Sequence, residues 1–160
     1  MSKTVEKFTG EYAFLSNFYP SIVTWSGHAY PTVEHAFQAA KTVEEVARRP
    51  FQLPAPVHQT ASRAKQAGRK LRLRPEWEEY KLGLMHDLLR EKFREMTMAR
   101  RLLETGNARL IEGNTWGDTY WGAIHNTRGS LVGENNLGRL LMEVRDELNG
   151  LVTLVPRMEP

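Results

Sequence analysis

The chain has 160 residues, a net charge of +3, a hydrophobic share of 41% and a charged share of 26%, which are the proportions of a soluble globular protein with a real core. It has no cysteine, which excludes a disulfide scaffold, a thiolate nucleophile and a Cys-ligated zinc or iron–sulfur site. The N-terminal residues lack the apolar region of a secretory signal, and no apolar run approaches the roughly 18 residues of a membrane span, so we expect a cytoplasmic protein without membrane contact.

The first thirty residues read as short extended segments rich in aromatic side chains. A hairpin is predicted over residues 22–30, with its turn at Ser26-Gly27. Thr32 is a good N-cap because its hydroxyl can accept from a backbone N–H of the first turn. The apolar spacing after it predicts a helix from Val33 to about Thr42.

This helix carries a row of polar side chains along one edge of its apolar stripe. Glu34, Gln38 and Lys41 form the row, and helical geometry separates Glu34 from Lys41 by about 20° in azimuth and roughly 10 Å in rise. A carboxylate and an amine there would line the border between core and solvent, where a site is partly desolvated and still reachable. The alternative is a solvated helix face with weak support from side-chain pairs.

The rest of the chain is predicted to be mainly helical. Residues 44–57 contain three prolines and are interpreted as a loop. The later predicted elements are a helix capped by Thr60 or Ser62 and reaching Arg69, a long helix over 75–95, a short helix through 101–103 that ends near Gly106, a strand over 109–112, and a last helix capped by Asn135 or Asn136 and ended by Gly150.

Two further segments are candidates for binding. Basic residues gather between Arg63 and Arg74 and again between Arg90 and Arg101, and such a strip could hold the phosphates of a nucleotide or a nucleic acid or be only a solvated face. Residues 113–122 read GNTWGDTYWG, where glycines allow close backbone approach and aromatic faces can stack on bases. The alternative for this segment is a packed turn with buried tryptophans.

Several catalytic classes lack their motifs. The five histidines form no HExxH-like pair, so metal catalysis has little support, and we expect no metal and no cofactor. The sequence has no G-x-S-x-G elbow, no GxGxxG fingerprint and no P-loop, which argues against a serine hydrolase, a dehydrogenase and a kinase. Carboxylate and amine chemistry in an aromatic pocket remains, and it fits cleavage of an N-glycosidic bond through an oxocarbenium-like state.

Three ordered blocks carry a family resemblance: FLSNFYP at 14–20, YPTVEHAFQAAK at 30–41 and NTWGDTYWG at 114–122. The chain resembles the NADAR family, which includes the YbiA-like N-glycosidases, over about residues 8–148. The resemblance implies an α+β, mainly α fold, in a compact single domain over 1–160 with about five to six helices and a short N-terminal hairpin.

The resemblance also implies site residues. Glu34 looks like the essential carboxylate, and Lys41 looks like a lysine that forms a Schiff base with an opened ribose, which requires a neutral amine with a depressed pKa. Asp118 is expected to have a second catalytic or orienting role. The expected substrate-binding residues are Asn17, Phe18, Tyr19, His35, Gln38, Arg69, Trp116, Tyr120, Trp121, Gly122 and Asn136. Asn17 could instead cap a turn, and Asn136 could serve an anion site or only cap its helix.

The implied substrates contain ribose phosphate. Similar proteins remove ADP-ribose from guanine in nucleic acid or cleave riboflavin-pathway intermediates, and the aromatic form of the third block looks closer to the ADP-ribose branch. We therefore expect removal of ADP-ribose from guanine in DNA or RNA as the first hypothesis and a riboflavin intermediate as the second. The third hypothesis is a non-catalytic module that binds ADP-ribose or nucleic acid through the basic strip.

Overall fold

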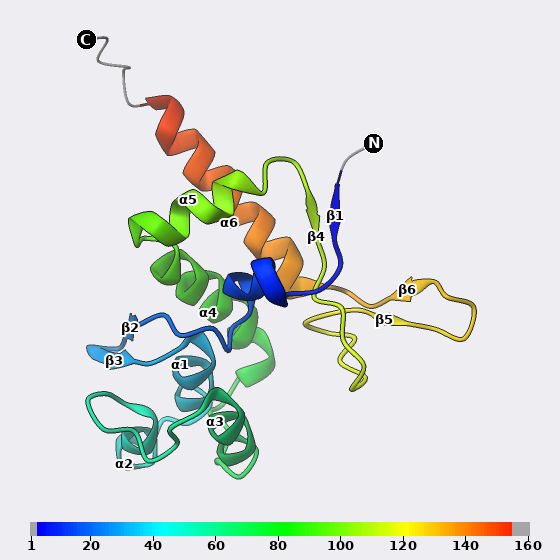
Figure 1. Ribbon diagram of the computed structural model, residues 1–160. Coiled ribbons are helices and arrows are strands. Elements are labelled where there is room, and N and C mark those ends of the chain that lie inside the picture. The colour runs from blue at the N-terminus through cyan, green and yellow to red at the C-terminus, as the bar shows by residue number, and fades with distance from the viewer. Residues whose placement is uncertain (1–2, 155–160) are drawn as a thin grey trace. The chain divides into compact units, whose positions relative to one another are not determined.

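The computed structural model describes residues 3–154, which form two compact units (Figure 1). Unit 1 contains the residues up to Leu15 and those from Phe93 onward, and unit 2 contains Ser16–Lys92. Helices dominate the described residues and the strands are only two or three residues long. This confirms the mainly helical α+β fold expected from the sequence.

Unit 2 begins with the predicted hairpin. Strands β2 (Val23–Trp25) and β3 (His28–Tyr30) pair antiparallel, with Val23 opposite Tyr30. Ser26 (φ 50°) and Gly27 (φ 77°) both lie in the left-handed region, which is the geometry of a two-residue hairpin turn that follows the twist of the strands.

Helix α1 (Val33–Ala39) is the centre of unit 2 and packs against α3 (Ala61–Gly68) and α4 (Trp77–Lys92). The Thr32 side chain caps it as predicted, by accepting from the His35 backbone N–H. All seven residues of α1 are buried, so the predicted border with solvent is wrong for Glu34 and Gln38, whereas Lys41, beyond the helix, is half-buried. The helix also ends at Ala39, before the predicted end near Thr42.

The predicted proline loop contains two short helical segments. Helix α2 (Glu45–Arg48) and the 3-10 helix η2 (Arg49–Phe51) occupy its first half. Pro50 is tolerated because it lies in the first turn of η2, where a backbone N–H has no helical partner to lose. The expectation of a loop throughout 44–57 is therefore wrong for this half.

The two later helices of unit 2 follow their predictions closely. Thr60 caps α3 as expected, accepting from the Arg63 backbone N–H. Helix α4 starts at Trp77, later than predicted, because Glu76 before it has a left-handed φ of 57°.

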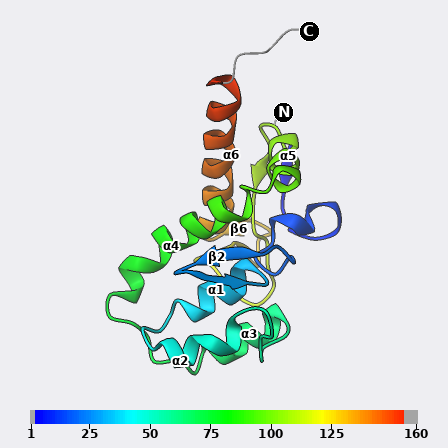
Figure 2. The ribbon, with the colours of Figure 1, turned by 90° about the vertical axis from the view of Figure 1, so that its left-hand side faces the viewer.

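Unit 1 joins the two ends of the described chain. Strand β1 (Thr4–Val5) pairs in parallel with β4 (Arg109–Leu110), and the 3-10 helix η1 (Gly10–Leu15) replaces the extended segment predicted there. Helix α5 (Met96–Glu104) packs against α6 (Asn136–Leu154), as Figure 2 also shows. The end of α5 before Gly106 (φ 57°) confirms the predicted stop.

Two features of unit 1 differ from the prediction. Helix α6 continues past Gly150 to Leu154, because a glycine weakens a helix without ending it. Strands β5 (Ile124–His125) and β6 (Leu131–Val132) form a hairpin for which no strand was predicted. The Asn126 side chain holds its turn by accepting from two backbone N–H groups. Within residues 3–154, no helix has the length and apolar character needed to cross a bilayer.

Candidate active site

The Glu34 carboxylate is a buried acid in the first turn of α1. Glu34 is only 6% exposed, and its Oε1 accepts a 2.6 Å hydrogen bond from Nε2 of Gln38, one turn later. The Glu34 backbone N–H donates to the carbonyl of Asn17 at 3.1 Å. A backbone hydrogen bond at Glu34 therefore joins the first and second sequence blocks.

Lys41 lies in the turn that follows α1, not on the helix itself. Its backbone N–H donates to the Gln38 carbonyl at 3.1 Å, and its own carbonyl accepts from the Arg74 backbone N–H at 2.5 Å. The Nζ atom is 5.9 Å from the centroid of the Phe37 ring. Glu34 and Gln38 therefore lie on one helix as expected, whereas Lys41 lies in the turn that follows the helix.

The Lys41 amine has a lowered pKa. Burial is the main cause, because it penalises the charged form. The Glu34 carboxylate acts in the opposite direction and raises the pKa. Three cations then lower it further: Lys65, Arg69 and Lys81. The neutral amine that a Schiff-base role requires is therefore favoured by burial and by neighbouring positive charge.

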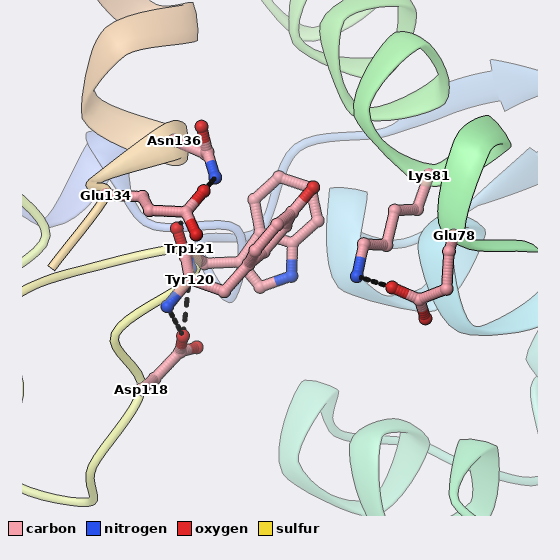
Figure 3. Close-up of polar contacts among 7 residues, drawn as sticks. All are labelled: Glu78, Lys81, Asp118, Tyr120, Trp121, Glu134 and Asn136. Carbon is pink, nitrogen blue, oxygen red and sulfur yellow. Dashed lines mark hydrogen bonds and ion pairs between the residues drawn. The ribbon is translucent and has the colours of Figure 1, made fainter.

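Positive charge gathers around the amine of Lys41 from two other helices of unit 2. Lys65 on α3 lies over the exposed Phe18 ring, with Nζ 5.8 Å from the centroid. Lys81 on α4 pairs with Glu78 one turn earlier (Figure 3). Arg69 follows α3 and is exposed.

The basic strip is not a uniform solvated face. Lys92 is fully buried and donates to the Ser16 carbonyl at 2.8 Å, while its Nζ lies 5.7 Å from the Tyr19 ring centroid. Arg74 stacks on Tyr80, with its guanidinium carbon 4.0 Å from the ring centroid. These members of the strip stabilise the fold of unit 2.

Asn17 has a hydrogen-bonding atom left over. The residue is 8% exposed, and its Nδ2 donates only weakly, to the Met85 sulfur at 3.4 Å. Its Oδ1 is buried and has no hydrogen-bond partner among the described residues. Such buried unpaired oxygens are rare in folded proteins and mark strain or function. Asn17 does not use this oxygen to cap a turn.

His35 is held at both ring nitrogens. Nδ1 shares a 2.8 Å hydrogen bond with the Thr32 hydroxyl, and Nε2 lies 2.7 Å from the His58 carbonyl, to which it donates. Burial lowers the pKa of the imidazole, so the neutral ring is favoured. With both nitrogens occupied, the ring ties α1 to the segment before α3 and keeps no donor or acceptor for a substrate.

In unit 1, the third sequence block forms a loop closed by Asn114. The Asn114 amide donates to the Asp118 carbonyl at 2.7 Å and accepts from the Asp118 backbone N–H at 2.9 Å. Oδ1 of Asp118 then accepts from the backbone N–H groups of Tyr120 and Trp121 at 3.1 and 2.8 Å (Figure 3). Asp118 therefore orders the loop. Asn114 was not among the predicted site residues, although an asparagine four residues before an aspartate is a signal of such closure.

The aromatic residues of this block differ in exposure. Trp116 is 64% exposed, next to Gly117 with a left-handed φ of 87°. Tyr120 and Trp121 meet edge to face, with centroids 4.9 Å apart. Gly122 is needed for close packing, because a Cβ there would lie 2.2 Å from the Glu112 carbonyl oxygen. The alternative of a packed turn therefore fits Gly122, whereas the exposure of Trp116 does not fit a buried tryptophan.

The start of α6 gives no free anion site. The backbone N–H groups of Asn136 and Leu137 donate to the carbonyls of Tyr120 and Trp121 at 3.2 and 3.0 Å. The Asn136 side chain donates to the Tyr120 carbonyl and to Glu134, as Figure 3 shows for the second contact. The structure therefore supports a role for Asn136 in fixing the third block to α6.

Unit 1 also contains a cavity of about 330 Å³ that is lined in part by the third sequence block. Asn114, Thr115 and Gly117 line it together with the glutamate and lysine after β1 and with residues of β5. In the part of the chain that the structure describes, no three metal-ligating side chains come together.

The predicted site residues thus fall into two groups. Unit 2 brings together Asn17, Glu34, Gln38 and Lys41, with the cations around the amine. Unit 1 brings together Asp118, Tyr120, Trp121, Gly122 and Asn136 in one hydrogen-bonded block.

Comparison with known proteins identifies relatives of the whole chain. The NADAR domain model matches residues 5–149. The N-glycosidase YbiA of Escherichia coli (strain K12) is 35% identical over 152 residues, which cover 92% of this chain and 91% of YbiA. A solved NMR structure of E. coli YbiA superposes with a TM-score of 0.79 at 32% identity, covering 100% of this chain and 94% of that one.

A second relative is much longer. A riboflavin biosynthesis protein of Vibrio vulnificus (strain YJ016) is 36% identical over 146 residues, which cover 86% of this chain. The chain spans only 36% of the length of that protein.

Proposed function

The chain belongs to the NADAR family, and from this premise we propose that it is an N-glycosidase that hydrolyses the bond between ribose and a nitrogen of a base. One observation carries the proposal: a buried carboxylate, Glu34, acts on the half-buried amine of Lys41, whose pKa is lowered. Three further cations lower the pKa of the same amine, and such perturbed groups cluster at functional sites.

The two groups fit complementary steps of such a reaction. The ionised Glu34 carboxylate stabilises the positive charge that develops at C1′ as the bond to the base weakens. The neutral Lys41 amine attacks C1′, the base leaves with a proton, and opening of the ribose ring gives an imine. Water then adds to the imine, which releases the sugar and restores the amine.

The surrounding charges favour a phosphorylated substrate. Lys65, Arg69 and Lys81 act on the site from two helices and supply positive charge that a phosphate group would neutralise. The exposed Phe18 ring offers a face on which a base can stack. The unpaired Asn17 oxygen offers an acceptor for a sugar hydroxyl or a base N–H.

We propose guanine-linked ADP-ribose in DNA or RNA as the substrate, on the strength of the aromatic third block with its exposed Trp116. A riboflavin-pathway intermediate is the second candidate, because one relative is named for riboflavin biosynthesis and spans the same domain. Both substrates join ribose phosphate to a base through nitrogen, so one site chemistry would serve either.

A direct assay separates these substrates. The protein is incubated with guanine-ADP-ribosylated DNA and, separately, with the riboflavin intermediate, and then treated with borohydride and examined by intact-protein mass spectrometry. Release of ADP-ribose or of ribose 5-phosphate identifies the substrate, and a reduced adduct mapped to Lys41 identifies the nucleophile. Lys41→Arg, which keeps the charge, is expected to form no adduct. Absence of release from both substrates would refute the proposal and leave a binding module.

A further inference from the structure

Gln38 is buried in the middle of the candidate site and bonded in an unusual way. The residue is 3% exposed, and its Nε2 donates to Oε1 of Glu34 at 2.6 Å. Its own Oε1 is buried without a hydrogen-bond partner in the described part of the chain. A buried amide oxygen without a partner lowers stability, so a residue that keeps one needs another reason to be there.

Gly68, the last residue of α3, fixes the direction of this amide. A Cβ at position 68 would lie 1.8 Å from Oε1 and 2.6 Å from Cδ of Gln38, so any larger residue there would force the Gln38 amide out of its place. Gly68 does not have a left-handed backbone, so the glycine at this position serves the close contact with Gln38 and not a special backbone conformation. The helix α3 therefore holds the Gln38 amide against α1.

The amide can face in only one direction. With Nε2 toward Glu34 it donates to the carboxylate, whereas the flipped amide would place two oxygens in contact and repel. The hydrogen bond holds one carboxylate oxygen in place.

We propose that Gln38, confined by Gly68, is a positioning residue that orients the Glu34 carboxylate for the glycosidase reaction, an inference that rests on the function proposed above. Gln38 was expected to bind substrate. The geometry instead has Gln38 act through Glu34, by holding the carboxylate in place.

Gln38→Met tests this directly, because methionine has a similar length and no donor. We expect kcat to fall about 10- to 100-fold, as when a partner that orients a reactive ligand is lost, while KM changes less than about threefold. The melting temperature should not fall, because the substitution also removes the unpaired oxygen. A loss confined to KM would overturn the proposal and return Gln38 to substrate binding.

A double variant distinguishes positioning from general damage. In a Glu34→Gln background the carboxylate is already gone, so adding Gln38→Met should change the residual rate less than about twofold. An additive loss would mean that Gln38 acts independently of Glu34, and the proposal would be wrong.

Gly68→Ala provides a second route to the same effect. The added methyl group must displace the Gln38 amide, so we expect the same fall in kcat as for Gln38→Met. Gly83→Ala is the matched control, because Gly83 is also a helical glycine of unit 2 and a Cβ there meets nothing within 4 Å. Equal activity of the two alanine variants would contradict the proposal.

An NMR measurement keeps the inference separate from the function. The side-chain amide proton of Gln38 should resonate downfield in the wild-type protein and move upfield in Glu34→Gln. An unchanged signal would overturn the inference whatever the enzyme cleaves. A shifted signal in a protein that cleaves neither substrate would refute the glycosidase function and leave only the structural pairing.

Discussion

Asn17→Leu tests whether a buried amide in the candidate site is kept for function at the cost of stability. Leucine has nearly the shape of asparagine but no hydrogen-bonding atoms. In the wild-type protein, Oδ1 of Asn17 is buried without a partner in the described structure, and Nδ2 has one weak contact to the Met85 sulfur.

The magnitude follows from these two atoms. A buried polar atom without a partner costs about 1–3 kcal/mol, and the lost contact to sulfur is worth well under about 1 kcal/mol. We therefore expect Asn17→Leu to raise the free energy of unfolding by about 1–2 kcal/mol, or the melting temperature by roughly 2–8 °C for a chain of this size. Asn17 contributes an acceptor to the proposed site, so KM should rise at the same time.

Asn114→Leu is the matched control, because Asn114 is also 8% exposed but has both amide atoms hydrogen-bonded. The same change there should lower the free energy of unfolding by about 2–4 kcal/mol, since backbone groups of Asp118 lose their partners. Thermal denaturation followed by circular dichroism compares the two variants. A fall in melting temperature for Asn17→Leu with an unchanged KM would refute the reasoning and make Asn17 a structural residue.

Three further substitutions test other parts of the structure. Glu34→Gln should reduce release of the sugar product to a small residual rate while leaving binding largely intact, and full turnover would remove Glu34 from the mechanism. Lys65→Met should raise the pKa of Lys41, because the Lys65 charge lowers it, so borohydride trapping should shift to higher pH; the exposed Lys70→Met is the control, and an equal shift there would argue against a local effect. Thr32→Val removes the cap of α1 and should lower the free energy of unfolding by about 1–2 kcal/mol in a urea titration, and no change would show that the cap is dispensable.

Local chemistry made part of the fold predictable. Caps at Thr32 and Thr60 and the turn at Ser26-Gly27 depend on residues next to one another in sequence, and the structure has each of them. The start of α4 was missed because nothing in the sequence marks Glu76 as left-handed, a conformation rare for a residue with a side chain.

The burial of α1 could not be predicted from periodicity. The polar row of Glu34 and Gln38 was expected at the border between core and solvent, yet both side chains are buried, and Gly68 of α3 packs directly against the Gln38 side chain. The sequence pattern identified Glu34 and Gln38 as members of one polar cluster. Their roles depend on a contact between segments thirty residues apart, which no local rule contains.

The arrangement of unit 1 has a consequence for how the protein folds. Its first strand pairs with β4 across the whole of unit 2, with Thr4 opposite Arg109, whereas unit 2 is one continuous segment. Closing a longer loop costs more chain entropy, so we expect Ser16–Lys92 to fold first and β1 to join β4 late. During synthesis on the ribosome, the segment with Glu34 and Lys41 would be complete before the partner of β1 has been made. Strand β1 would therefore stay unpaired until β4 has been made, and chaperones that bind extended chains could hold it in that interval.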